Sequence, residues 1–130
     1  MSFLLRYCKL CKNIGVQMKN MVRLEEFAFF IVSIYLFSLL SYPWWLFLVL
    51  ILVPDLSMIG YIHSTKIGAI IYNFFHHRAL SILIGAVGYY LGKEIFMLVG
   101  IIMFAHSSLD RVFDYGFKFF DDFKHSHLSD

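Results

Sequence analysis

Four ionisable side chains lie inside the most apolar parts of this sequence. They are Asp55, His76, His106 and Asp110. Ionisable groups are expensive within a bilayer, and they therefore indicate a function when they occur there. Two imidazoles and two carboxylates form a ligand set that suits Zn²⁺, Mn²⁺ or Fe²⁺. We therefore predict a divalent metal site at these residues, with Asp55 and His106 as its catalytic pair.

The spacing of these residues along predicted helices places them at a similar depth. At about 1.5 Å per residue, Asp55 lies roughly 16 Å below the outer start of its helix. His76 lies roughly 13 Å above the inner start of the next helix, and His106 lies roughly 18 Å into the last one. His106 and Asp110 stand at positions i and i+4 and so share one helix face. Pro54 removes a helical hydrogen bond beside Asp55 and opens backbone groups to the carboxylate. Three helices therefore converge on the middle-to-inner half of the bilayer.

The composition requires that these elements face lipid. Of the 130 residues, 60% are hydrophobic and 15% are charged, and the mean hydropathy is +0.73. A soluble domain is roughly half apolar and about a quarter charged, and a chain of this length could not bury the excess. The net charge of +2 is too small to favour nucleic acid as a partner. The predicted partner is the lipid bilayer.

The apolar residues form four stretches, each near the roughly 20 residues that a membrane-spanning helix needs. The stretches cover about 24–40, 44–62, 67–91 and 94–113. Strand alternation is absent, and short loops favour antiparallel neighbours. We predict an all-α integral membrane bundle of about four transmembrane helices in one domain, residues 23–113. An amphipathic basic leader, residues 1–22, precedes it, and a cytoplasmic tail, residues 114–130, follows it.

Basic residues indicate how the bundle is oriented. Five of the eleven basic residues precede the first apolar stretch, and Lys66, Arg111, Lys118 and Lys124 fall on the same side, whereas Lys93 falls on the opposite side. Because positive loops stay in the cytoplasm, we expect both termini in the cytoplasm and the chain in the cell inner membrane. The leader is either a helix on the inner membrane surface, or a dispensable extension if translation begins at Met18 or Met21.

Several other motifs indicate structure more than chemistry. The single pair Cys8 and Cys11 is too little for a zinc site. His77 and Arg78 point away from the face of His76 and are predicted to reach towards lipid phosphate. Three glycines form a small-residue face for close helix packing. They are Gly85, Gly88 and Gly92. The tail carries His125 and His127, and His127 is predicted as a further metal ligand if the tail folds under the bundle.

A series of short motifs resembles a bacterial family of small four-helix membrane proteins of unknown function. The motifs are Arg23-Leu24-Glu25, Pro54-Asp55-Leu56-Ser57-Met58-Ile59-Gly60-Tyr61, Tyr72-Asn73-Phe74-Phe75-His76, His106-Ser107-Ser108-Leu109-Asp110-Arg111, Tyr115-Gly116-Phe117-Lys118 and His127-Leu128. The resemblance covers roughly residues 23–128. Members of that family tend to carry Gly where this chain has Asp114, and an acidic tail motif where it reads His125-Ser126-His127-Leu128.

More distantly, the order of motifs is similar to that of the membrane-bound metal-dependent hydrolases. Pro54-Asp55 matches the first element of those enzymes, but Ser57 and Met58 replace its second Asp and its His. His77-Arg78 matches a His-Arg pair, although no Thr-His-Ser follows it. The resemblance implies a metal site more strongly than it implies a reaction.

Three functions from different classes agree with these residues. The first is a metal-dependent hydrolase that acts on a lipid or another amphiphile at the cytoplasmic leaflet. The second is a non-enzymatic protein in which the same residues form a proton-sensitive network or a small transport path, which would require a homo-oligomer. The third is a structural or partner-binding bundle. Metal content and the effect of His106→Ala distinguish them.

Overall fold

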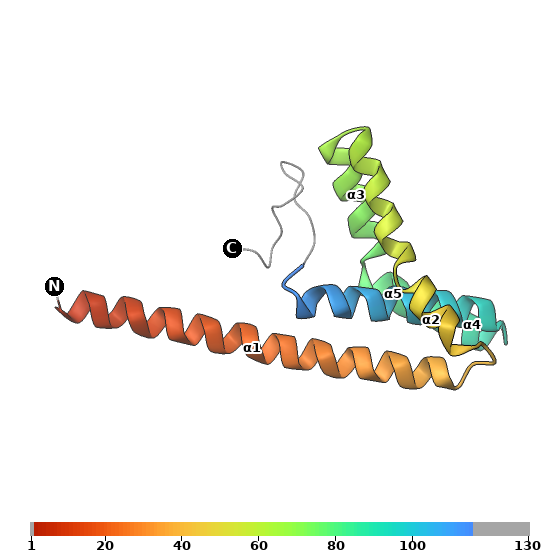
Figure 1. Ribbon diagram of the computed structural model, residues 1–130, viewed down its shortest axis with the longest axis horizontal. Coiled ribbons are helices and arrows are strands. Elements are labelled where there is room, and N and C mark those ends of the chain that lie inside the picture. Colours follow the sequence, from red (N-terminus) through yellow and green to blue (C-terminus); the bar gives the residue numbers. More distant parts are fainter. Residues whose placement is uncertain (1, 116–130) are drawn as a thin grey trace.

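The structure, a computed structural model, describes residues 2–115, and within this range the chain forms helices and no strand. The helices are α1 (Ser2–Ser38), α2 (Trp44–Leu50), the 3-10 helix η1 (Val53–Ile62), α3 (Thr65–Phe75), α4 (Arg78–Tyr90) and α5 (Glu94–Val112). Helix α5 packs against α1 and α4, while η1 and α3 pair in a hairpin that projects from them (Figure 1). The predicted all-α class is confirmed.

Helix α1 joins the leader and the first apolar stretch in one continuous helix of 37 residues. At 1.5 Å per residue it is about 55 Å long, which exceeds the roughly 30 Å of a bilayer core. Its N-terminal part extends beyond the other helices (Figure 1). The helix ends before the Ser41-Tyr42-Pro43 connection, and Pro43 adopts the extended conformation that allows α2 to begin at the next residue.

Two of the predicted helices are interrupted, and both interruptions lie at candidate ligands. The stretch 44–62 divides into α2 and η1 near Pro54, and Asp55 stands in the first turn of η1. A 3-10 helix of ten residues is unusually long. The stretch 67–91 divides into α3 and α4, which are bent by 43° at His76 and His77. The hydroxyl of Ser107 donates to the carbonyl of His76 at 3.0 Å, which satisfies that backbone group where the helix breaks.

A buried apolar core joins α1, α2 and α5. Its buried members are Phe37, Phe47, Ile51, Leu98, Ile102 and Ala105. The rings of Phe37 and Phe47 lie 5.0 Å apart between centroids, at a tilt of 60°. This core holds Ile51 against α5, and Ile51 is the residue whose carbonyl reaches His106 in the site described below.

Small residues bring α4 close to α5, as the glycine spacing predicts. A Cβ added at Gly88 would lie 2.5 Å from the backbone nitrogen of Met97, and one at Gly100 would lie 2.6 Å from the backbone nitrogen of Gly85. The interpretation of Gly92 as a third packing position is wrong, because nothing lies within 4 Å of a Cβ there. Gly92 instead ends the helix with a φ of +61°, a conformation that glycine adopts freely.

By length and composition, two helical segments of the described chain are able to cross a membrane. They are Trp44–Ile62 and Glu94–Val112, and the bent pair Thr65–Phe75 and Arg78–Tyr90 makes up to three. The stretch 24–40, which lies mostly in α1, is not among these segments. A helical membrane protein is thus supported, whereas the count of four spans is not confirmed.

Candidate metal centre

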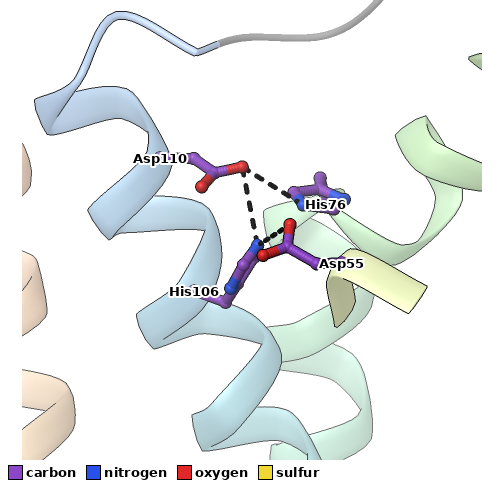
Figure 2. A group of neighbouring side chains, drawn as sticks. All are labelled: Asp55, His76, His106 and Asp110. Atoms are coloured by element: carbon purple, nitrogen blue, oxygen red, sulfur yellow. Dashed lines mark ion pairs between the residues drawn. The ribbon is translucent and has the colours of Figure 1, made fainter. Parts of the chain in front are cut away.

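The four predicted ligands come together at the junction of η1, α3 and α5. Asp55 comes from the first turn of η1, His76 ends α3, and His106 and Asp110 lie one turn apart on α5 (Figure 2). Each offers one ligand atom, and the four atoms all lie within 4.8 Å of one another. Residues separated by more than fifty positions therefore form one compact cluster, which we call the His/Asp cluster.

The carboxylates and imidazoles face one another across short distances. Nε2 of His76 lies 3.2 Å from Oδ2 of Asp110, and Nε2 of His106 lies 3.2 Å from Oδ1 of Asp55. Nε2 of His106 also lies 3.5 Å from Oδ2 of Asp110. The two imidazole rings meet edge to face, with centroids 4.8 Å apart. The side chains therefore point inward to a common centre, as Figure 2 shows.

Backbone carbonyls determine which imidazole nitrogen faces that centre as an acceptor. Nδ1 of His76 lies 2.8 Å from the carbonyl oxygen of Tyr72, and Nδ1 of His106 lies 2.5 Å from that of Ile51. A carbonyl oxygen only accepts, so each Nδ1 carries the proton and donates it. In the neutral ring, Nε2 then presents a lone pair and has no donor among the described residues, whereas a protonated Nε2 would donate to the carboxylates. The two Nε2 atoms thus face carboxylate oxygens, and either a metal cation between them or a proton on each Nε2 satisfies this arrangement.

Tyr72 supports two of the four ligands, and sequence reasoning missed it. Its hydroxyl donates to Oδ2 of Asp110 at 2.8 Å, and its ring stacks on that of His76 at 3.8 Å between centroids. Its carbonyl accepts from His76, and only 1% of the residue is exposed. The i to i+4 spacing of Tyr72 and His76 was the available signal, because it places both on one helix face.

Access to the cluster is uneven. The side chains of His76 and His106 are almost wholly buried, whereas 43% of the Asp55 side chain is exposed. Asp55 is therefore the ligand that a molecule from outside would meet first.

A second polar cluster lies between α1, α4 and α5, and sequence reasoning missed its acidic member. Glu26, 5% exposed, forms an ion pair with Arg78, and Arg111 lies 3.8 Å from its other oxygen. The Arg78 guanidinium also lies over the rings of Phe29 and Phe104, at 5.0 and 5.4 Å. The prediction that Arg78 reaches towards lipid phosphate is wrong, because Glu26 and the two rings hold it inside the bundle.

The remaining sequence candidates do not join the His/Asp cluster. Cys8 and Cys11 are free, exposed thiols on α1. His77 is exposed and precedes α4. His125 and His127 lie outside the described residues, so the predicted fifth ligand stays a prediction.

The fold and the cluster define an all-helical chain that is able to span a membrane and carries a His/Asp group able to hold a metal ion. Residues 19–130 match the family model described as a domain of unknown function (DUF4260). The match covers most of the chain, which therefore belongs to that family. No curated protein and no solved structure matches it. Membership of an uncharacterised family is confirmed, while the individual motifs and the hydrolase resemblance stay predictions.

Proposed function

We propose that this chain is a multi-pass protein of the cell inner membrane with a membrane-embedded metal site, and that it hydrolyses a lipid or another amphiphile. Asp55, His76, His106 and Asp110 would hold a zinc, manganese or iron ion. The observation that carries the proposal is the inward convergence of four acceptor atoms, two of them buried nitrogens without a hydrogen-bond partner. A divalent ion would satisfy all four at once.

The same arrangement supports hydrolysis as the reaction class. A divalent ion in such a site makes water a nucleophile near neutral pH, which is the chemistry that it would supply here. In this proposal Asp55, the most exposed ligand, would accept a proton from an attacking water, while His106 lies between both carboxylates. Hydrolysis adds water across a bond and needs no further co-reactant.

The test is elemental analysis of the protein purified in mild detergent without chelators. We expect about one metal equivalent in the wild type and almost none in His106→Ala. His63→Ala is the matched control, because His63 is an exposed histidine outside the cluster and should keep the metal. A wild type without stoichiometric metal, or a His106→Ala variant that keeps it, would overturn the metal site.

A second candidate function rests on the same distances. The 3.2 Å separations between Nε2 atoms and carboxylate oxygens also fit charge-assisted hydrogen bonds if a proton takes the place of the metal. The cluster would then be a proton-sensitive network in a non-enzymatic protein, and a transport path through it would need a homo-oligomer. Absence of metal together with pH-dependent assembly or conductance would favour this function.

The proposed topology has its own test. With both termini in the cytoplasm and four spans, reporter fusions at Pro43 and Lys93 should lie outside the cytoplasm and one at Lys66 inside. A fusion at Lys66 on the outer side would contradict the proposed location of the cluster at the cytoplasmic leaflet.

A further inference from the structure

An apolar groove lies beside the His/Asp cluster, in the corner between the η1–α3 hairpin and α5. Its volume is about 670 Å³, within the range of roughly 300–1,000 Å³ typical of small-molecule sites. Among the side chains that line it, only those of Ser57 and His63 are polar. The apolar walls include Leu56, Ile59, Ile71, Phe75, Val99 and Ile102.

The groove reaches the cluster on each of its three elements. On η1, the lining residues Pro54 and Ser57 flank Asp55. On α3, Phe75 lines the groove and directly precedes His76, and on α5, Met103 lines it and stands one turn before His106. Every element that supplies a ligand therefore also supplies groove wall next to that ligand. The four ligands themselves are not among the described residues that line the groove, so a molecule in the groove would lie next to the cluster on these three segments.

Hydrocarbon is the occupant that the walls favour. Leu56 and Ile59 are 61% and 62% exposed, so the groove presents apolar side chains outward along Trp44–Ile62, a segment apolar enough to span a membrane. The polar cluster and the apolar groove next to it are complementary to an amphiphile, which has a polar group and an apolar chain. The bilayer around the protein is the nearest source of such molecules.

Ser57 is a polar feature of the groove that lacks a partner. Its residue is 8% exposed, and its hydroxyl makes no hydrogen bond. A buried hydroxyl without a partner is unfavourable, and in native proteins such a group usually meets a ligand or a water. Ser57 lines the groove two residues after Asp55, and its oxygen is enclosed in the groove wall. A small movement of this wall would bring the hydroxyl to an oxygen of a bound molecule close to the cluster.

We propose that this groove binds one acyl chain of an amphiphile and that the Ser57 hydroxyl donates a hydrogen bond to the carbonyl oxygen of the acyl linkage. The inference deepens the proposed function, on which its catalytic meaning rests, by naming the substrate class as an acyl lipid.

The test uses a lysophosphatidylcholine whose acyl chain carries a diazirine near its end, added to the full chain in detergent. Light should crosslink the probe to peptides that contain groove residues of η1, α3 and α5. Excess unlabelled lysophosphatidylcholine should suppress this labelling. Val99→Trp, which fills the groove, should lower the labelling about tenfold. Val87→Trp is the control, because Val87 is similarly exposed on α4 and does not line the groove.

The role of Ser57 is tested by comparing two competitors with and without an ester carbonyl. The wild type should bind the acyl lysolipid more tightly than its alkyl-ether analogue, and Ser57→Ala should lose that preference while it keeps the chain-dependent labelling. Labelling that is spread evenly over the lipid-facing helices would overturn the proposal that the groove binds the chain. Labelling that Val99→Trp leaves unchanged, in a variant of normal helical content, would overturn it as well. A preference retained in Ser57→Ala would overturn the hydrogen bond.

Metal analysis of the same samples separates this inference from the proposed function. Specific groove labelling in a protein without metal would leave a lipid-binding site and refute the hydrolase. Stoichiometric metal with non-specific labelling would keep the metal site and refute the acyl groove.

Discussion

The hydroxyl of Tyr72 donates a 2.8 Å hydrogen bond to Oδ2 of Asp110, the same oxygen that lies 3.2 Å from Nε2 of His76. One buried phenol thus orients a carboxylate on α5 from a position on α3. The carbonyl of Tyr72 also accepts from Nδ1 of His76, so a single residue positions one oxygen ligand and one nitrogen ligand. Such supporting contacts are a regular part of protein metal sites.

Replacing Tyr72 by Phe should therefore weaken metal binding without abolishing it. The ring and its stacking on His76 remain, but Asp110 loses its donor, and we expect a loss of about 10- to 100-fold in metal affinity. Competition with a chelator of known affinity measures this. Tyr35→Phe, at an exposed tyrosine of α1, is the control and should bind like the wild type. Equal affinities in all three proteins would show that Tyr72 only fills space.

Replacing Glu26 by Gln should destabilise the bundle. The substitution leaves the Arg78 guanidinium without its counter-charge, and 21% of the Arg78 side chain is exposed. We expect a loss of about 3 kcal/mol in the free energy of unfolding, which is the lower end of the range for breaking a buried ion pair. The lower end applies because water reaches part of the Arg78 side chain and stabilises its unpaired charge. Denaturant unfolding in micelles measures it.

Glu25→Gln provides the comparison, because Glu25 is the exposed neighbour of Glu26 on α1 and its charge acts on Arg78 only from a distance. A surface substitution of this kind should change the stability by less than about 0.5 kcal/mol. Similar losses for the two variants would contradict the structural role of the ion pair between Glu26 and Arg78.

Two Gly→Ala substitutions should change the free energy of unfolding in opposite directions. At Gly100, the added methyl would lie 2.6 Å from the backbone of Gly85 and of Ser81, which forces α4 and α5 apart. Overpacking of this kind costs about 1–3 kcal/mol. At Gly15, nothing lies within 4 Å, so alanine should stabilise α1 by about 0.5–1 kcal/mol through its helix propensity. If the unfolding midpoints of both variants moved in the same direction, the close packing of α4 and α5 at Gly100 would be refuted.

The contact between Arg23 and Asp114 predicts a dependence of stability on pH. Nε of Arg23 donates to Oδ1 of Asp114 at 3.1 Å, and this hydrogen bond holds the pKa of the Asp114 carboxyl below its ordinary value of 3.8. A carboxyl with a lowered pKa in the folded state stabilises above its unfolded pKa and loses that contribution as pH falls through the folded one. The stabilisation should thus be complete near neutral pH and fade below about pH 4.

Asp114→Asn tests this, because asparagine tolerates the left-handed φ of +64° at that position. The stability difference from the wild type should be present at pH 6 and shrink towards pH 3, and Arg23→Gln should reproduce it. A stability difference that stays constant from pH 6 to pH 3 would show that the ion pair does not contribute.

Much of the local structure could be predicted from residue types alone. The apolar runs and the lack of strand alternation indicated helices. The connections before Trp44 and after Ile62 fall in the gaps between the predicted apolar stretches. The four candidate ligands could also be found, because ionisable residues stand out in an apolar background and His106 and Asp110 share a helix face by spacing.

The interruptions at Asp55 and His76 were not predictable in the same way. A continuous apolar run reads as one helix, whereas η1 and the bend at His76 depend on contacts made by distant residues, such as the Ser107 hydroxyl on the His76 carbonyl. The ion pair between Glu26 and Arg78 was missed for the same reason, since its partners are separated by half of the described chain.

The sequence by itself determined that this chain is helical, apolar enough for a membrane and equipped with two histidines and two aspartates that can bind a metal. Only the tertiary structure decided that the four ligand atoms meet within 4.8 Å, which nitrogen each histidine presents, and that an apolar groove adjoins them. The physical reason is that periodicity along one helix sets which face a residue occupies, whereas packing between helices sets which faces meet.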